Sequence, residues 1–213
     1  MTRKELKEQA KQNLRGNWKW AALSSIFAVA LFIIGSWMTA NDVTNNNEHI
    51  IGDIISIIAS FTFIGMAITF LHFNDKLGKV DKKPFQASLT VYNKKYFVPG
   101  LKVYFSRLIF IALWCLLLII PGIIKEYSYS MAEFIMTDMI DSGKSMTFTQ
   151  AITESKKLMN GHKMDFFILR LSFVGWALLA CLPLGLGLIW VYPYRYATEA
   201  AFYRKLAGNK FRQ

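Results

Sequence analysis

Residues 50–73 read IIGDIISIIASFTFIGMAITFLHF and contain one acid, Asp53, but no lysine or arginine. A helix of about 20 predominantly apolar residues is long enough to cross the hydrocarbon core of a bilayer. A run of this length without basic residues therefore predicts a transmembrane helix. This prediction sets the class of the fold, and the rest of the chain is interpreted outward from it.

A second apolar run precedes this helix at residues 21–39 and is separated from it by a polar stretch, NDVTNNN. Because the run follows a charged segment, it also resembles a signal peptide. It lacks a clean A-x-A cleavage site, however, and further membrane segments follow it. These two features favour an uncleaved transmembrane helix.

Four more candidate spans follow. Residues 107–121 end at Pro121-Gly122, which predicts a tight turn, and 123–140 continue as a less apolar helix. That helix either spans the membrane or lies on its surface, since its length just matches a span. The last pair, 164–182 and 186–203, is divided by PLGLG at 183–187. We therefore predict a single domain over residues 1–213, an all-α polytopic membrane helical bundle of about six transmembrane helices.

The composition and charge pattern favour a membrane over a nucleic acid as the main partner. The chain has 213 residues, 54% of them hydrophobic, and a net charge of +11. Its basic residues stand in short blocks between apolar runs, which excludes a continuous nucleic-acid-binding face and favours anionic lipid headgroups. Four segments hold 6, 7, 4 and 4 of the 25 lysines and arginines: 1–20, 74–106, 141–163 and 204–213. With six spans they share one side, so the positive-inside rule places both termini in the cytoplasm.

The first 20 residues predict an amphipathic helix at the membrane interface. Leu6, Ala10 and Leu14 form one apolar stripe within residues 2–15, and the other faces are basic. Thr2 and Glu5 have the spacing of a capping box. We expect this helix to lie on the cytoplasmic surface, with the tryptophans of the WKW stretch at 18–20 anchoring the first span.

A weak internal repeat suggests three units, each an amphipathic helix followed by a membrane hairpin. Arg107-Leu108 matches Arg170-Leu171, and a Tyr-x-Tyr follows the turn in each copy. The stretch LRGNW at 14–18 resembles the same junction. Chance similarity between apolar helices is the alternative explanation, because such internal symmetry is weak in many membrane proteins.

Several short motifs together resemble a family of bacterial integral membrane proteins, known as domain of unknown function 975. They are Ala10-Lys11, LRGNW at 14–18, the IIPGI turn with Tyr127 and Tyr129, SKKLM at 155–159 with Gly161, LSFVGW at 171–176, and Pro193-Tyr194 with Phe202-Tyr203. The resemblance covers nearly the whole chain and implies the plasma membrane of a Gram-positive bacterium. It carries over no catalytic residues.

Charged residues within the spans are the best indicators of a functional interior, because a charge near the bilayer centre is costly unless it is paired or hydrated. Arg195 and Glu133 are expected at similar depth, on helices that occupy equivalent places in the suspected repeat, and are predicted to face each other. Glu199, four residues after Arg195, is the rival partner. Arg107 and Arg170 are placed at cytoplasmic helix starts, where a long side chain can reach the interface.

A set of polar residues from the two hairpins is expected to line this interior. The candidate site residues are Glu126, Tyr127, Tyr129, Glu133, Tyr192, Tyr194, Arg195 and Glu199. One interpretation is a pathway for a substrate or ion. The other is a buried ion pair that fixes the register of the helices. The sequence leaves both open.

The chain lacks the motifs of the common enzyme classes. It has no HExxH, no GxSxG and no glycine-rich phosphate loop, so we predict no catalytic, metal or cofactor site. The leading hypothesis is a noncatalytic membrane protein that exports, shields against or senses an amphipathic lipid or peptide. The alternative is a scaffold that recruits a partner through its cytoplasmic helices, and a lipid-active enzyme is third. A homo-oligomer or a membrane-protein partner is compatible with each.

Overall fold

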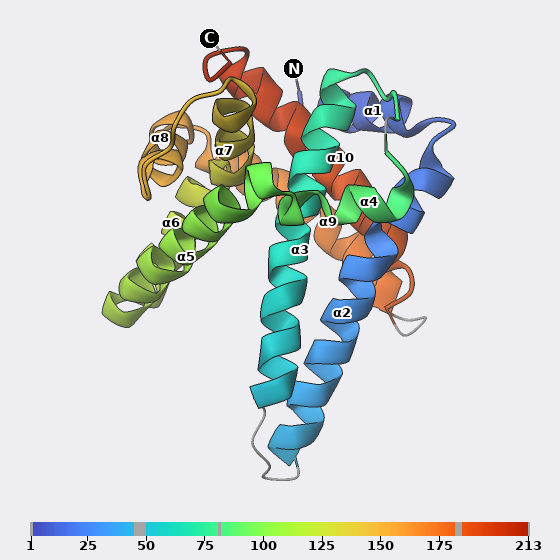
Figure 1. Cartoon of the computed structure of the whole chain (residues 1–213), viewed down its shortest axis with the longest axis vertical. Helices are drawn as coiled ribbons and strands as arrows, with labels where there is room; N and C mark the ends of the chain where they lie inside the picture. Colours follow the sequence, from blue (N-terminus) through green and yellow to red (C-terminus); the bar gives the residue numbers. More distant parts are fainter. Residues whose placement is uncertain (1, 45–49, 81, 182–184, 213) are drawn as a thin grey trace.

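A computed structural model describes residues 2–44, 50–80, 82–181 and 185–212, with the backbone only at 42–44, 117, 119 and 181. The described residues form helices and no strand, which confirms the all-α prediction. The helices are α1 (Arg3–Leu14), α2 (Trp18–Thr44), α3 (Ile50–Asp75), α4 (Pro84–Ser88), the 3-10 helix η1 (Thr90–Tyr92), α5 (Lys94–Leu117), α6 (Ile119–Tyr129), α7 (Ala132–Asp141), α8 (Gln150–Leu158), α9 (Lys163–Cys181) and α10 (Leu188–Ala207). Figure 1 shows their arrangement.

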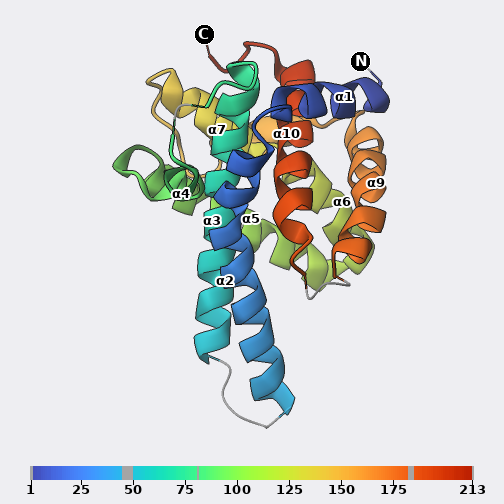
Figure 2. The same cartoon turned by 90° about the vertical axis from the view of Figure 1, so that its right-hand side faces the viewer.

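Helices α2 and α3 form a long hairpin that projects beyond the other helices (Figures 1 and 2). Close packing of small residues joins the two helices. A Cβ atom added at Gly35 would come within 3.0 Å of Ser56, and one added at Gly52 would do the same at Thr39. Small residues at helix contacts let backbones approach closely in membrane proteins. The hairpin therefore rests on close backbone contact, and most of its outer surface is left apolar.

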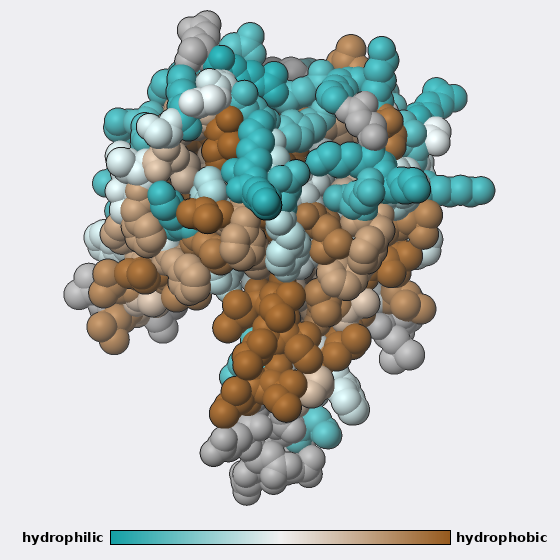
Figure 3. All heavy atoms as spheres, in the orientation of Figure 1, coloured by the Kyte–Doolittle hydropathy of each residue, from teal (hydrophilic) through white to brown (hydrophobic). Residues whose placement is uncertain are grey.

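Polarity divides the molecule along its long axis. Hydrophilic residues cover the upper end in Figure 3, where α1 and the last turn of α10 lie, and hydrophobic residues cover the projecting hairpin and the lower part of α5. Among the described residues, three helices are long and apolar enough to cross a membrane: α2, α3 and α5. The described part of the chain thus has the surface of a membrane protein with one polar end.

The N-terminal helix has the predicted boundaries and cap, but its apolar stripe meets protein. Thr2 accepts a hydrogen bond from the backbone N–H of Glu5, and the Glu5 carboxylate accepts one from the N–H of Thr2. Leu6, Ala10 and Leu14 are buried, and α1 packs chiefly against α10. The stripe therefore attaches the helix to the bundle.

The third predicted span differs in both boundaries from the helix in the structure. We expected a helix over 107–121, whereas α5 begins at Lys94, where Asn93 caps it by accepting from the N–H of Lys95. It ends at Leu117, and the reversal occurs at Leu118, which is extended. Pro121 is thus not the turn but the third residue of α6, a position in the first helical turn that tolerates a missing N–H.

The fourth predicted span, 123–140, is broken into two helices. Helix α6 ends at Tyr129 and α7 begins at Ala132. A side chain of α8 supplies the hydrogen bonds at the break: the hydroxyl of Ser155 accepts from the N–H of Met131 at 3.1 Å and donates to the carbonyl of Ser128 at 2.9 Å. A contact distant in the sequence thus replaces part of the helical bonding at this point.

At the polar end, an ion cluster holds α3, α7 and α10 together. Asp138 is 1% exposed and accepts from the hydroxyl of Tyr203 at 2.7 Å and from Nη2 of Arg204 at 2.6 Å. Arg204 also bonds Asp75 through Nε at 2.6 Å, and Arg212 contacts both acids. Burial of Asp138 is tolerated because two arginines and a hydroxyl satisfy its carboxylate.

Candidate functional site

A cavity of about 580 Å³ lies among six helices, α3, α5, α6, α7, α9 and α10. This volume is within the usual range of small-molecule sites. The residues that line it are Ser60, Phe63, Ile64, Tyr104, Arg107, Leu108, Ile111, Ala112, Glu126, Glu133, Arg170, Arg195, Tyr196 and Glu199. We refer to it as the ionic cavity, since six of these residues are charged.

One half of the charged lining is organised around Arg107 of α5. Its Nη1 lies 2.8 Å from Oε1 of Glu133 on α7, and its Nη2 contacts Oε1 of Glu126 on α6. A guanidinium group can bind two carboxylates at once because its N–H groups point in several fixed directions. Arg107 therefore joins three helices through one side chain.

The other half is organised around Glu199 of α10. Nε of Arg170 on α9 lies 3.0 Å from Oε1 of Glu199, and Nε of Arg195 lies 3.5 Å from the same oxygen. Nη1 of Arg170 is also 3.9 Å from Oε1 of Glu126. The six charges therefore form one alternating chain, in the order Glu133, Arg107, Glu126, Arg170, Glu199, Arg195. Their formal charges cancel, which reduces the cost of placing them in an apolar setting.

Arg195 ends this chain and is the least satisfied member. Its guanidinium carbon lies 4.8 Å from the ring centre of Tyr192 and 5.0 Å from that of Tyr196. Contact with aromatic faces stabilises a cation. Its Nε atom is buried, however, and has no hydrogen-bond partner among the described residues. A buried donor without a hydrogen bond is costly, although the carboxylate of Glu199 offsets part of that cost through its charge.

The remaining lining is largely apolar. Phe63 and Ile64 come from α3, whereas Leu108, Ile111 and Ala112 come from α5. The lining of the ionic cavity thus combines charged and apolar residues. Such a surface is complementary to a molecule that has both polar and apolar parts.

The structure brings four of the eight predicted site residues into the ionic cavity: Glu126, Glu133, Arg195 and Glu199. Tyr127 and Tyr192 line a neighbouring pocket of about 270 Å³ that shares Arg170 and Arg195 with the cavity. Tyr129 instead packs against Phe110, and Tyr194 against Trp18 and Phe173. These last two tyrosines serve aromatic packing outside the cavity.

The predicted pairing of Glu133 with Arg195 is wrong. Glu133 pairs with Arg107, and Arg195 pairs with the rival partner Glu199. The break before α7 explains the difference, because the expected depth of Glu133 assumed one unbroken helix from residue 123. Glu133 instead lies in the first turn of a new helix.

Sequence reasoning also misplaced two arginines that turn out to be central. Arg107 and Arg170 were expected to reach the membrane interface from helix starts. Arg107 instead lies thirteen residues after the start of α5 at Lys94, and Arg170 lies seven after the start of α9 at Lys163. Both side chains face the cavity. Their matching positions in the suspected repeat were the signal that could have identified them.

Comparison with known proteins assigns a family to this part of the chain. Residues 104–210, about half of the chain, match the model of a family described as Protein of unknown function (DUF975). The match includes all six charged residues of the ionic cavity. No curated protein and no solved structure matches the chain.

Proposed function

The chain belongs to the DUF975 family, and from the geometry of the ionic cavity we propose that it is a noncatalytic membrane protein that binds an amphipathic lipid or peptide. Binding of this kind would serve export of the ligand, protection against it or sensing of it. The observation that carries the proposal is the division of the lining into an alternating chain of six charges and an apolar wall.

The charges favour a ligand with a polar group that accepts hydrogen bonds. The six charges already neutralise one another, so a large net charge on the ligand is not required. The Arg195 side chain is 29% exposed, and a phosphate, carboxylate or carbonyl oxygen of the ligand would bind its accessible N–H groups. The apolar remainder of the ligand would lie against Phe63 and Leu108.

The proposal includes a membrane topology of six crossings with both termini in the cytoplasm of a bacterial cell. Helices α2, α3 and α5, which are long and apolar enough to cross a membrane, would be three of the crossings. The proposal adds α9 and α10 as two more. Helix α6 alone, with 11 residues, would span only about 16 Å, so the broken pair of α6 and α7 forms the remaining one. The hydrophilic end seen in Figure 3 supports this arrangement, since it gathers α1 and the end of α10.

A photoreactive phospholipid tests the proposal on the full chain in lipid nanodiscs. We expect crosslinks at the apolar wall, around Phe63 and Leu108, in excess of those on exposed residues such as Leu116 and Trp176. Arg195→Gln should remove this excess and leave assembly intact. Lys205→Gln is the matched control, because it removes one positive charge from an exposed position of the same helix. Uniform crosslinking over the surface would contradict the proposal for lipids, and a photoreactive amphipathic peptide then provides the second probe.

A scaffold that recruits a partner is the second candidate, and exposed apolar residues on α4 and α5 favour it. Phe85 on α4 is 57% exposed, and Val98 on α5 is 54% exposed. Exposed apolar surface of this kind is available for contact with a partner or with lipid. If scaffolding is the function, Phe85→Ser should abolish the cellular phenotype and Arg195→Gln should preserve it.

A further inference from the structure

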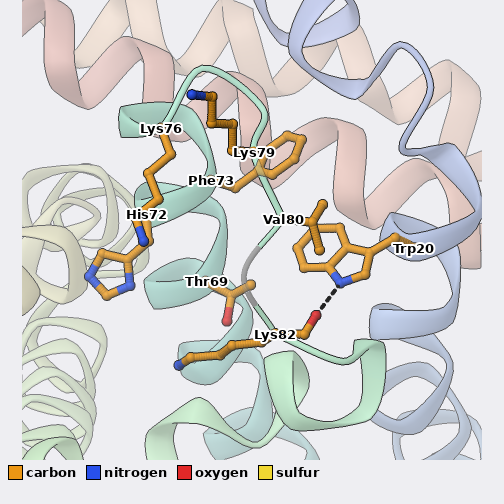
Figure 4. A pocket seen from close by; sticks show the side chains of 8 residues that line it. All are labelled: Trp20, Thr69, His72, Phe73, Lys76, Lys79, Val80 and Lys82. Carbon is orange, nitrogen blue, oxygen red and sulfur yellow. Dashed lines mark hydrogen bonds between the residues drawn. The ribbon is translucent and has the colours of Figure 1, made fainter.

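A second pocket lies at the polar end of the hairpin and shares no residue with the ionic cavity. It encloses about 90 Å³ and is lined by Trp20, Thr69, His72, Phe73, Lys76, Lys79, Val80 and Lys82 (Figure 4). A water molecule occupies roughly 30 Å³, so the space suits a group of a few heavy atoms. All of these residues lie outside the part of the chain that the family model matches.

The lining of this pocket combines positively charged residues with the aromatic residues Trp20 and Phe73. Three of the eight lining residues are lysines, and none is an acid. Trp20 stacks on Phe73 with ring centres 5.3 Å apart, and its Nε1–H donates to the carbonyl of Lys82 at 2.8 Å. Figure 4 shows this bond closing one side of the pocket, with the side chains of Lys82 and His72 extending away from Trp20. The indole bond thus fixes the backbone that carries Lys82.

The nearest acids on neighbouring helices are already bound by other groups. Asp141 contacts Nε2 of His72 at 2.6 Å and also bonds Lys95 and Tyr96. Asp75 forms ion pairs with Arg204 and Arg212. Both carboxylates thus bind other groups at short range, although the charge of Asp141 also attracts Lys82.

Lys82 is the lining residue that we expect to contact a bound anion. Its Nζ donates to the hydroxyl of Thr90 at 3.2 Å, and no described carboxylate lies within 4.0 Å of it; Asp81 is outside the described residues. Partial burial lowers the pKa of Lys82, although the residue is exposed overall. A bound anion would offset that cost of burial.

We infer that this pocket binds a phosphate group, and that the group belongs to the headgroup of an anionic phospholipid. Phosphate oxygens match the ammonium groups of lysines as strong charge-assisted acceptors. The pocket lies where α2 begins and α3 ends, at the polar end of the hairpin. Tryptophan is enriched at the interface between membrane and water, and clustered lysines there attract anionic lipid.

The test compares phosphatidylglycerol with soluble phosphates on the full chain in a neutral detergent. Native mass spectrometry counts bound phosphatidylglycerol, and calorimetry measures binding of glycerol 3-phosphate and inorganic phosphate. Lys82→Gln should weaken lipid binding about tenfold, whereas Lys82→Arg should retain it. Lys83→Gln is the matched control, because it removes the same charge from the next residue, which does not line the pocket. We expect that variant to bind within about twofold of the unmodified chain.

Each outcome has a defined meaning. If Lys82→Gln and Lys83→Gln lower the affinity for phosphatidylglycerol equally, the proposed site is wrong. Such a result would show that the lipid is attracted to the basic surface as a whole. Glycerol 3-phosphate could compete with the lipid, and its binding could be lost in Lys82→Gln. These two results together would support a phosphate site but would overturn its assignment to a lipid. Binding of phosphatidylcholine as tight as that of phosphatidylglycerol would overturn the requirement for an anionic lipid. The comparison of Lys82→Gln with Lys83→Gln separates this pocket from the ionic cavity, because neither lysine lines that cavity.

Discussion

Arg107 of α5 and Arg170 of α9 contact the same oxygen atom, Oε1 of Glu126. This shared acceptor joins the two halves of the ionic cavity, because Arg107 also binds Glu133 and Arg170 also binds Glu199. Glu126 thus separates two cations that would otherwise face each other. Its side chain is 35% exposed, whereas that of Glu199 is 3% exposed.

This difference in burial predicts unequal effects of two matched substitutions. Glu199→Gln should destabilise the chain by about 3 kcal/mol, since it leaves Arg170 and Arg195 without their buried partner. Glu126→Gln should cost about 1 kcal/mol or less, because water can reach the charges around it. Thermal unfolding in detergent measures both. Equal losses would show that the chain of charges is not organised by burial.

A double-mutant cycle tests the contact between Arg107 and Glu133. Either single change to methionine should lower stability, and the double change should recover part of the loss, with a coupling of about 1–3 kcal/mol. Lys94→Met is the control on the same helix, at an exposed position. Additive effects of the two changes would place Glu133 outside the reach of Arg107.

We predict that the folded protein loses stability in acid as Asp141 becomes protonated. Burial alone would raise the pKa of Asp141, but hydrogen bonds from His72, Lys95 and Tyr96 outweigh it and hold the pKa well below its usual range. The unfolded chain, with an Asp pKa near 3.9, then takes up the proton first. The stabilisation is complete above about pH 4 and is lost as the pH falls below it. Unfolding midpoints measured from pH 6 to pH 3 should show a smaller decrease for Asp141→Asn.

Gly65 marks a close approach between α3 and the end of α4. A Cβ atom added there would collide with the carbonyl oxygen of Ser88, whereas one added at Gly175 in α9 would meet nothing within 4 Å. Gly65→Ala should therefore lower stability by about 1–3 kcal/mol through overpacking. Gly175→Ala should be neutral or stabilising, since alanine favours a helix. Thermal unfolding of the two variants gives the comparison.

Thiol labelling on intact cells tests the proposed topology, in a variant without Cys115 and Cys181. A cysteine at Asn46, which lies outside the described residues, should react with an impermeant reagent. Cysteines at Lys82 and Lys156 should not react, because the basic segments are expected in the cytoplasm. Labelling of a cysteine at position 156 would refute the model of six crossings. It would place α6 and α7 on the membrane surface.

Apolar run length was sufficient to predict the long helices α2, α3, α9 and α10. The run at 50–73 became α3 (Ile50–Asp75), and that at 164–182 became α9 (Lys163–Cys181) with nearly the expected boundaries. The cap of α1 was also predictable, because Thr2 and Glu5 make their contacts within one helical turn. These features depend on residues close together in the sequence.

The features that were missed depend on distant contacts. Nothing near Ser130 identifies a helix break, because the hydrogen bonds that sustain it come from Ser155, 25 residues later. The same break changed the partner of Glu133. Arg107 was misjudged because Asn93 starts its helix well before the apolar run begins. The set of charged side chains was therefore largely predictable, but its pairing was not.

The hydrogen bonds of Ser155 at the break between α6 and α7 tie α8 to two of the helices that line the cavity. Glu126 lies before the break and Glu133 after it, and both bind Arg107. The relative placement of these two acids therefore depends on a side chain that does not itself line the cavity.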